Sequence, residues 1–593
     1  MTGDPTRTEL VDPAERRAAV DAALGRRPFD VLVAGGTVVD VATGELREAD
    51  VGIVGRLIAS VHPRGARADA ARIVDAAGGF VAPGLIDSHM HVESSMMTPR
   101  VYAQTVLPQG TTTVVWDPHE VGNVLGLEGV RWAIAASRDL PLRVLTLAPS
   151  CVPSAPGLEL SGATFDGPEM REMLSWPEIA GVAEVMDMRG VLDGSARMRA
   201  IVGEGLASGK LVCGHARGLA GPELEAYAAA GVGSDHELVS AEDCLAKLRA
   251  GLTVELRGSH DYLLPDCVAA LNALPMVPQT LTLCTDDVFP DDLVDKGGMV
   301  DLLRRLVRYG LAPTQAIRAA TLNAAMRLKR DDLGLVGPGR RADIVVFDDL
   351  ATLGVRHVLA DGELAASAGR LLSTLRPDPV AAPTATMRLA PLAPDDFAPR
   401  VPGRADGPVR LNAIRGARFT AWSQVETRIE AGRVVLPDGV SVMAMAHRHG
   451  RGPATPALAL LEDWGTFRGA FATTVSHDSH NLAVFGRDPA DMAAAANALI
   501  ACGGGMAVAK DGKVTALLPL PVCGLLSEDA PEAIAAGFRA VKAACDDIAE
   551  WKPPYRVFKA FVGASLACNA GPHLTDLGLT DGGTGEIRPA VVA

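Results

Sequence analysis

The sequence predicts an α/β fold built on a TIM-type (β/α)8 barrel, with a split small β-domain and an additional carboxyl-terminal α/β domain. Short apolar runs alternate with amphipathic stretches across residues 81–335. The number of these β/α units and the length of the segment match such a barrel. Alternating β-like runs precede this segment and resume after it. The chain has 593 residues, more than one ordinary core accommodates, so further domains are expected.

The segments before the barrel begin with a polar amino-terminal extension, residues 1–27, which contains the helical pattern ERRAAVDAAL. Residues 28–80 contain short alternating apolar runs separated by turns, a pattern typical of a β-meander. The same pattern returns in RRADIVVFDDL and VRHVLADGELAA. We therefore expect residues 28–80 and 336–375 to form one composite small β-domain.

The barrel segment contains eight strand candidates, each followed by a turn or a helical pattern. They are the run ending in PGLIDSH, then TTTVVWDP, LRVLTLAPS, IAGVAEVMD, KLVCGHA, GVGSDHE, LTVELRGSH and LTLCTDD. Beyond the barrel, residues 376–402 are rich in proline, which favours a linker or an extended wrap. Residues 403–593 again mix strand-like and Ala-rich helical patterns, so they form the carboxyl-terminal domain.

Composition restricts the class of partner. The net charge is −15, which argues against nucleic acid or an anionic membrane as a partner. The nine cysteines include no C-x-x-C pair, and the polar start MTGDPTRTELVDPAERR lacks the apolar core of a signal peptide. The apolar-looking run MAAAANALIACGGGMAVA contains an asparagine and three consecutive glycines, which make it a poor membrane span. We expect a soluble, cytoplasmic protein.

The motif PGLIDSHMHVESS contains the first candidate site. His89 and His91 are two residues apart at the end of a predicted strand, so both imidazoles point to the same face. Two imidazoles directed at one point are a common way to hold a divalent metal. Two surface histidines in a loop remain the alternative for this motif taken alone.

Polar residues at the ends of other predicted strands favour the metal site. Glu184 lies on the fourth strand, His215 and His236 end the fifth and sixth, and Asp286 follows the eighth. In a (β/α)8 barrel these strand ends meet at one face, where catalytic groups sit. The repeated occurrence of histidine and carboxylate there is poorly explained by chance.

These motifs resemble those of a known superfamily. The His-X-His, the later histidines, the aspartate and the closing segment LGLVGPGRRADIVVFD are similar to the amidohydrolase superfamily. Within it, HMHVESSMMTP, WDPHE, GVAEVMDM, GHARG, SDHE and CTDD resemble the adenine deaminase family closely. VSHDSHN and GGGMAVAKDGKV resemble its carboxyl-terminal domain. The stretch LSWPEIAGVAEVMDMRG has no lysine, so Glu184 takes the place of the carboxylated lysine found in many members.

The resemblance implies hydrolytic deamination of adenine to hypoxanthine and ammonia, a step of purine salvage, at a binuclear metal centre. It suggests that His89, His91 and Asp286 hold one ion and that His215 and His236 hold the other, with Glu184 as the bridge. Manganese and iron are the expected metals, and zinc is a third candidate. A metal-bound hydroxide would attack C6, and Asp286 would carry a proton to the departing amine.

Several neighbouring residues keep open roles. His119 and Glu120 either contact the purine or orient a ligand histidine. Asp287 is a candidate helix cap, and Asp286 is preferred because it directly follows the strand. The histidines of the carboxyl-terminal domain have metal-like spacing and could form a third metal site, the pocket mouth, or structural contacts and a lid. They are His447, His449, His477 and His480.

Two other functions are weighed against this one. An amino-sugar-phosphate deacetylase can also use a glutamate ligand, but it needs a basic phosphate clamp that the sequence does not reveal. A non-catalytic scaffold would be expected to lack a ligand, whereas all six ligand positions are filled. The expected partner is a small-molecule purine, without nucleic acid or membrane, and a homo-oligomer (a dimer or higher) is expected.

Overall fold

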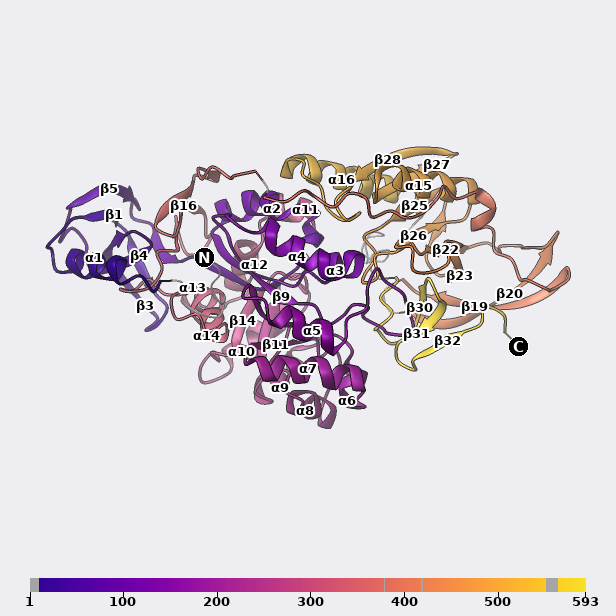
Figure 1. Ribbon diagram of the computed structural model, residues 1–593, viewed down its shortest axis with the longest axis horizontal. Helices are drawn as coiled ribbons and strands as arrows, with labels where there is room; N and C mark the ends of the chain where they lie inside the picture. The colour runs from indigo at the N-terminus through magenta and orange to yellow at the C-terminus, as the bar shows by residue number, and fades with distance from the viewer. Residues whose placement is uncertain (1–9, 378, 418–419, 551–563, 593) are drawn as a thin grey trace.

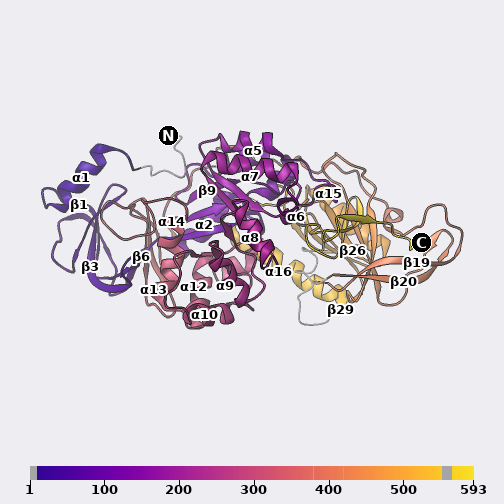
Figure 2. The same ribbon diagram turned by 90° about the horizontal axis from the view of Figure 1, so that it is seen from below.

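The fold is taken from a computed structural model that describes residues 10–377, 379–417, 420–550 and 564–592. The molecule is elongated, with a small β-domain at one end, the barrel in the middle and the carboxyl-terminal domain at the other end (Figure 1). The view from below shows the same order (Figure 2). No described helix is long and apolar enough to cross a membrane.

The small β-domain is a ten-stranded sheet formed by segments that precede and follow the barrel in the sequence. Its strands are β1 (Phe29–Ala34), β2 (Thr37–Asp40), β3 (Glu45–Val54), β4 (Leu57–Pro63), β5 (Ala70–Asp75), β6 (Phe80–Pro83), β15 (Ile344–Phe347), β16 (Val355–Ala360), β17 (Glu363–Ser367) and β18 (Arg370–Leu371). Strand β15 pairs antiparallel with β6, which joins the two segments. Helix α1 (Pro13–Ala23) packs against this sheet and is tied to it by a 2.8 Å ion pair between Glu15 and Arg56.

Eight parallel strands form the barrel wall. They are β7 (Leu85–Met90), β8 (Thr111–Trp116), β9 (Arg143–Ala148), β10 (Ile179–Val185), β11 (Leu211–Gly214), β12 (Ser234–Asp235), β13 (Thr253–Arg257) and β14 (Leu281–Cys284). They fall into sheets of five and three strands. The Gly233 N–H donates to Val212 O at 2.9 Å and the Asp286 N–H donates to His89 O at 3.1 Å, which connects the two sheets at both edges. The predicted barrel is therefore confirmed.

Helices cover the outside of this wall. They are α2 (Pro99–Val106), α3 (His119–Leu125), α4 (Leu127–Ala136), α5 (Gly167–Leu174), α6 (Met188–Leu192), α7 (Ala196–Ser208), α8 (Pro222–Ala229), α9 (Ala241–Arg249), α10 (Leu264–Asn272), α11 (Pro290–Asp295), α12 (Met299–Arg308), α13 (Pro313–Arg318) and α14 (Ala324–Arg327). Helix α12 shows why they pack there: Leu302, Leu303 and Leu306 are buried, whereas its arginines lie on the other side. Strand β10 is buried at all seven positions, as expected of a parallel strand covered on both faces.

The carboxyl-terminal domain is built on a nine-stranded sheet. In spatial order its strands are β21 (Arg433–Val434), β20 (Ala421–Glu430), β19 (Gly407–Arg415), β23 (Ala457–Glu462), β22 (Val440–Ala446), β26 (Leu482–Gly486), β25 (Ala470–Thr473), β27 (Gly505–Lys510) and β28 (Lys513–Pro519). Helices α15 (Pro489–Cys502) and α16 (Pro531–Ile548) pack on it. The proline-rich segment lies against this domain, where Leu392 exchanges hydrogen bonds with Asn497.

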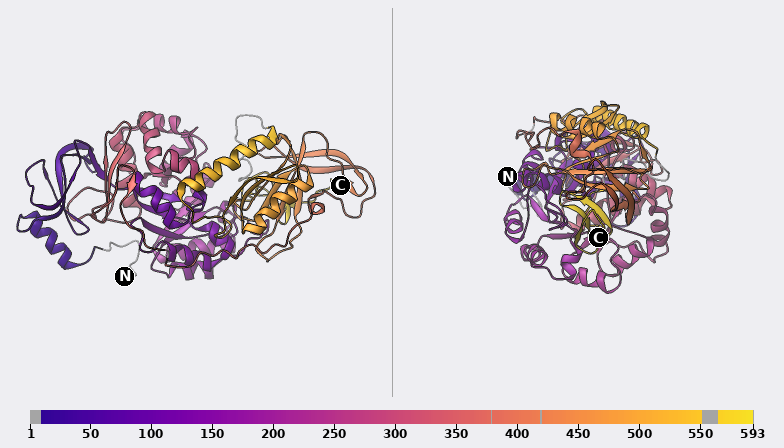
Figure 3. Two further views of the ribbon diagram at one scale, coloured as in Figure 1. Left: turned by 90° about the horizontal axis from the view of Figure 1, so that it is seen from above. Right: turned by 90° about the vertical axis from the view of Figure 1, so that its right-hand side faces the viewer.

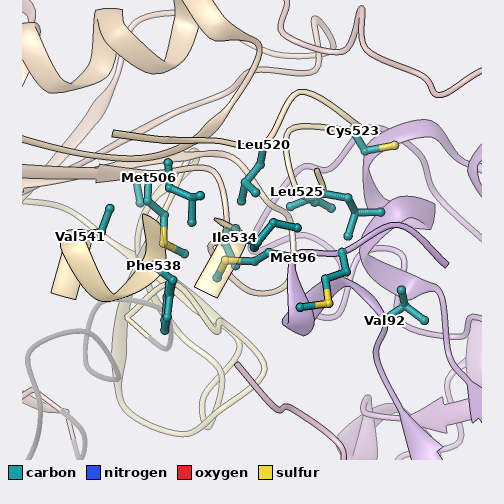
Figure 4. Packing of buried hydrophobic residues seen from close by; sticks show 14 of the residues in the cluster. Val92, Met96, Met506, Leu520, Cys523, Leu525, Ile534, Phe538 and Val541 are labelled. Atoms are coloured by element: carbon teal, nitrogen blue, oxygen red, sulfur yellow. The ribbon is translucent and has the colours of Figure 1, made fainter. Parts of the chain in front are cut away.

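A shared apolar core joins this domain to the barrel. Figure 3 shows α16 running along the junction, and Figure 4 shows Met96 of the barrel facing Leu525 and Ile534 of the carboxyl-terminal domain. Phe538 of α16 stacks on Phe289 of the barrel with ring centroids 5.4 Å apart. Because these side chains are packed in one continuous cluster, the two domains are held in a fixed arrangement.

Candidate metal centre

The two histidines of the His-X-His motif are buried at the carboxyl end of β7. His89 lies within the strand and His91 follows its last residue, so both rings turn to the barrel mouth, with centroids 4.9 Å apart. Neither ring nitrogen of His89 has a hydrogen-bond partner among the described residues. Buried imidazoles without partners are costly unless a ligand satisfies them, which is the first indication of a metal.

Glu184 on β10 lies between two pairs of histidines. Its Oε1 is 3.9 Å from His89 Nε2 and 3.4 Å from His91 Nε2. Its Oε2 is 2.7 Å from His215 Nδ1 and 3.2 Å from His236 Nε2. Oε1 thus faces His89 and His91, with His119 Nδ1 also 3.6 Å away, whereas Oε2 faces His215 and His236. This arrangement would suit a carboxylate held between two ions.

Asp286 lies just beyond β14, beside the histidines of the His-X-His motif. Its Oδ1 is 3.5 Å from His89 Nε2 and 3.2 Å from His91 Nε2, whereas Oδ2 contacts Nε of Arg257. Burial opposes the negative charge, but Arg257 holds the pKa of Asp286 well below its usual range. Asp287 points elsewhere, toward Ser94 and Arg257. The carboxylate beside the histidines is therefore Asp286.

The chemistry and spacing of these groups fit divalent metals. Ligand atoms about 2.0–2.2 Å from one ion lie roughly 3–4 Å from one another. The nitrogen–oxygen pairs around Glu184 and Asp286 have such separations, except that His215 Nδ1 is within direct hydrogen-bond distance of Glu184 Oε2, at 2.7 Å. Four groups of described residues that could hold an ion include members of this set: His89–His91–Asp286, His89–Glu184–His236, His215–His236–Glu237 and His91–Asp117–His119–Glu184. Burial opposes the charge of Glu184, but the histidines, His236 first, keep its pKa well below the usual range. The lowered pKa values of Glu184 and Asp286 favour the ionised form, which metal binding needs.

His119 and Glu120, at the start of α3, lie beside this centre. His119 Nδ1 is 3.1 Å from Asp117 Oδ2 and 3.6 Å from Glu184 Oε1. Glu120 Oε2 is 3.7 Å from His91 Nδ1, and burial together with Glu93 raises the pKa of Glu120 well above its usual range. Both side chains therefore adjoin the candidate ligands, on the side toward the carboxyl-terminal domain.

The four histidines of the carboxyl-terminal domain fall into different environments. His447 Nδ1 is 3.0 Å from Asp576 Oδ2, and His449 Nε2 is 2.8 Å from Ser479 O, so both have protein partners. Among the described residues, neither belongs to a group that could hold an ion, whereas His477 does, together with His119 and Glu120. His480 is buried without a ring hydrogen-bond partner in the described part of the chain.

Two residues near the centre, Arg257 and Asp478, were not singled out from the sequence, and Asp117 was recognised only as a polar residue at the end of the second strand. Arg257 pairs with Asp286, Asp117 with His119, and Asp478 Oδ1 lies 3.7 Å from His119 Nε2. Asp117 ends the second strand in the motif WDPHE, so its position at the barrel mouth was a usable signal. Asp478 lies between His477 and His480 in VSHDSHN, but its place beside the barrel depends on the docking of another domain, which the sequence does not reveal.

Comparisons with known proteins show which family the chain belongs to. Residues 80–371 match the amidohydrolase family, and residues 417–586 match the adenine deaminase C-terminal domain. "Adenine deaminase 2" of Rhizobium meliloti is 61% identical over 589 residues, which cover 98% of each chain. The chain belongs to the adenine deaminase family. The resemblance predicted from its motifs is thereby confirmed.

Other members of the family match this chain at lower identity over nearly its full length. "Adenine deaminase" of Klebsiella pneumoniae strain 342 is 59% identical and covers 98% of this chain and 96% of its own length. "Adenine deaminase" of Moorella thermoacetica is 38% identical and covers 98% of this chain and 97% of its own length. Amidohydrolases use divalent metals, in line with the clusters around Glu184.

Proposed function

We propose that this protein is an adenine deaminase, which hydrolyses adenine to hypoxanthine and ammonia. Its relatives over nearly the full chain bear that name. The structural observation that carries the proposal is Glu184, whose two oxygens each face a separate pair of buried histidines. This favours a binuclear centre at the mouth of the barrel, where such enzymes react.

The ligands proposed for the two ions are those of the sequence prediction. His89, His91 and Asp286 would hold one ion, His215 and His236 the other, and Glu184 both. Manganese or iron suits this mixed nitrogen and oxygen set, and zinc is the third candidate. When bound, the ions supply Lewis-acid activation of water, which provides a strong nucleophile at neutral pH.

The protein's own residues must then move a proton, because a water oxygen adds at C6 and the C6–N bond breaks to release ammonia. Asp286 is the proposed carrier: its Oδ1 faces the metal pocket, while Arg257 holds Oδ2. It would accept the proton of the attacking water at Oδ1 and donate it to the amine nitrogen. Glu120, whose pKa is raised by burial, is proposed to donate a hydrogen bond to a ring nitrogen.

Product analysis tests this function. Protein loaded with manganese, iron or zinc is incubated with adenine, and ammonia, hypoxanthine and metal content are measured on the same preparation. We expect equal amounts of the two products and a plateau of activity near two ions per chain. Release of acetate from an N-acetyl amino-sugar phosphate without ammonia from adenine would instead support the deacetylase alternative.

The cellular setting proposed is purine salvage in the cytoplasm, by a homo-oligomer. All nine cysteines are free, which suits a reducing compartment. Size-exclusion chromatography with light scattering tests the assembly, because a mass of 61.6 kDa would identify a monomer.

A further inference from the structure

One loop of the carboxyl-terminal domain reaches the metal pocket. It comprises residues 475–481, VSHDSHN, between β25 and β26, and is called here the roof loop. Asp478, on this loop, is buried, with its Oδ1 3.7 Å from His119 Nε2 and 3.6 Å from His477 Nδ1. Because His119 in turn adjoins Glu184, one imidazole ring separates Asp478 from the proposed bridging ligand.

The roof loop is held by hydrogen bonds at both ends. The His480 N–H donates to Ser476 O at 2.9 Å, and Ser476 Oγ donates to Asn481 O at 2.5 Å. Asn481 Nδ2 donates to Leu160 O of the barrel at 2.9 Å, which ties the loop to the barrel rim. The carboxylate of Asp478 is therefore presented by a rigid support, as a substrate-binding group must be.

The polar atoms of this wall face one another across gaps too wide for direct hydrogen bonds. The separations are 3.7 Å from Asp478 to His119, 3.6 Å from Asp478 to His477 and 4.0 Å from Glu120 Oε1 to His477 Nδ1. Asp478 Oδ2, His119 Nε2 and both oxygens of Glu120 lack hydrogen-bond partners among the described residues. Buried polar groups of this kind are normally satisfied by ordered water or by a polar ligand, so this wall can bind a polar molecule.

We propose that Asp478 binds the purine, by accepting a hydrogen bond from N9–H of the base. This proposal rests on the proposed function. It names Asp478 as the residue that makes the enzyme specific for a free base. A carboxylate can only accept hydrogen bonds, so it selects a ring nitrogen that carries a proton. N9–H lies at the end of the purine that is remote from C6. Asp478 is likewise remote from the proposed metal ligands, because the His119 side chain lies between them. A nucleoside has no proton at N9 and leaves the carboxylate buried without a partner, which rejects it.

Inhibition by two purines tests this contact in the metal-loaded enzyme. Purine retains N9–H, whereas 9-methylpurine lacks it, and their inhibition constants are measured in competition with adenine. We expect the unchanged enzyme to bind purine much more tightly than 9-methylpurine. Asp478→Asn should reduce this preference about tenfold, because a hydrogen bond to a charged group stabilises a complex more than one to a neutral group. Asp478→Ala removes the hydrogen bond and should reduce the preference about 100-fold. The ratio of the two constants does not depend on how much of each preparation is folded.

The control is Asp546→Asn, an exposed aspartate on α16 of the same domain, which should leave the ratio and the KM for adenine unchanged. Both Asp478 variants should retain two ions per chain and show a raised KM. An unchanged ratio in either variant, or equal inhibition by the two purines in the unchanged enzyme, overturns the proposal. Loss of a metal ion in Asp478→Asn also overturns it, because Asp478 would then be a ligand. Failure of the proposed function itself is a separate result: no ammonia from adenine with the unchanged enzyme.

Discussion

Asp286→Asn separates the two tasks assigned to Asp286, that of metal ligand and that of proton carrier. Asn keeps the size of the side chain and a carbonyl oxygen that coordinates weakly, but it cannot carry the proton. We expect kcat for adenine to fall about 10²–10⁴-fold, the usual cost of removing a general acid–base group. Both ions should stay bound, because Glu184 and the four histidines remain.

The surroundings of Asp286 also determine the cost in stability. A buried Arg257 without a partner would cost about 3–5 kcal/mol. Arg257 also contacts Glu237 and lies 3.3 Å from Asp287, so its charge stays compensated in the variant. We therefore expect the free energy of unfolding to fall by less than that range, and the variant to be isolated folded.

Asp287→Asn is the matched control, since Asp287 is partly exposed and points to Ser94 and Arg257. Its kcat should stay within a few-fold of the unchanged enzyme. The assay measures kcat and metal content for both variants on the same day. An inactive Asp287→Asn beside a normal Asp286→Asn would refute the reasoning, and so would loss of both ions from Asp286→Asn.

The remaining predictions concern the metals and the domain junction. Glu184→Gln should lower metal content and activity together, because a neutral amide bridges two cations poorly; elemental analysis showing full metal with normal turnover would remove Glu184 from the site. Chelation should abolish ammonia release and lower the melting temperature, both restored by Mn²⁺, since ligands that bind the folded state stabilise it; activity that persists in metal-free protein would contradict this. Phe538→Ala should cost roughly 3–5 kcal/mol in chemical denaturation by opening a cavity against Phe289. Val514→Ala, at an exposed position, is the control. Equal free energies of unfolding for the two variants would show that the junction is not tightly packed.

The sequence by itself determined the barrel and the kinds of side chain at its mouth. Strand and helix periods are local, so buried runs such as LTLC predict β14 without knowledge of its neighbours. Polar residues at the ends of such strands converge because parallel strands in a barrel end at one face. His89, Glu184, His215 and Asp286 could thus be singled out from their positions along the chain.

The tertiary structure decided which charges pair and which domain lies against the candidate metal centre. Arg257 looks like an ordinary strand residue until the barrel closes and brings β13 beside β14, where it meets Asp286. Asp478 reaches His119 only because an apolar core docks the carboxyl-terminal domain onto the barrel. The periodicity of a sequence shows which face of an element is buried, but not which distant element packs on that face. The contacts of Arg257 and Asp478 depend on this packing between distant elements.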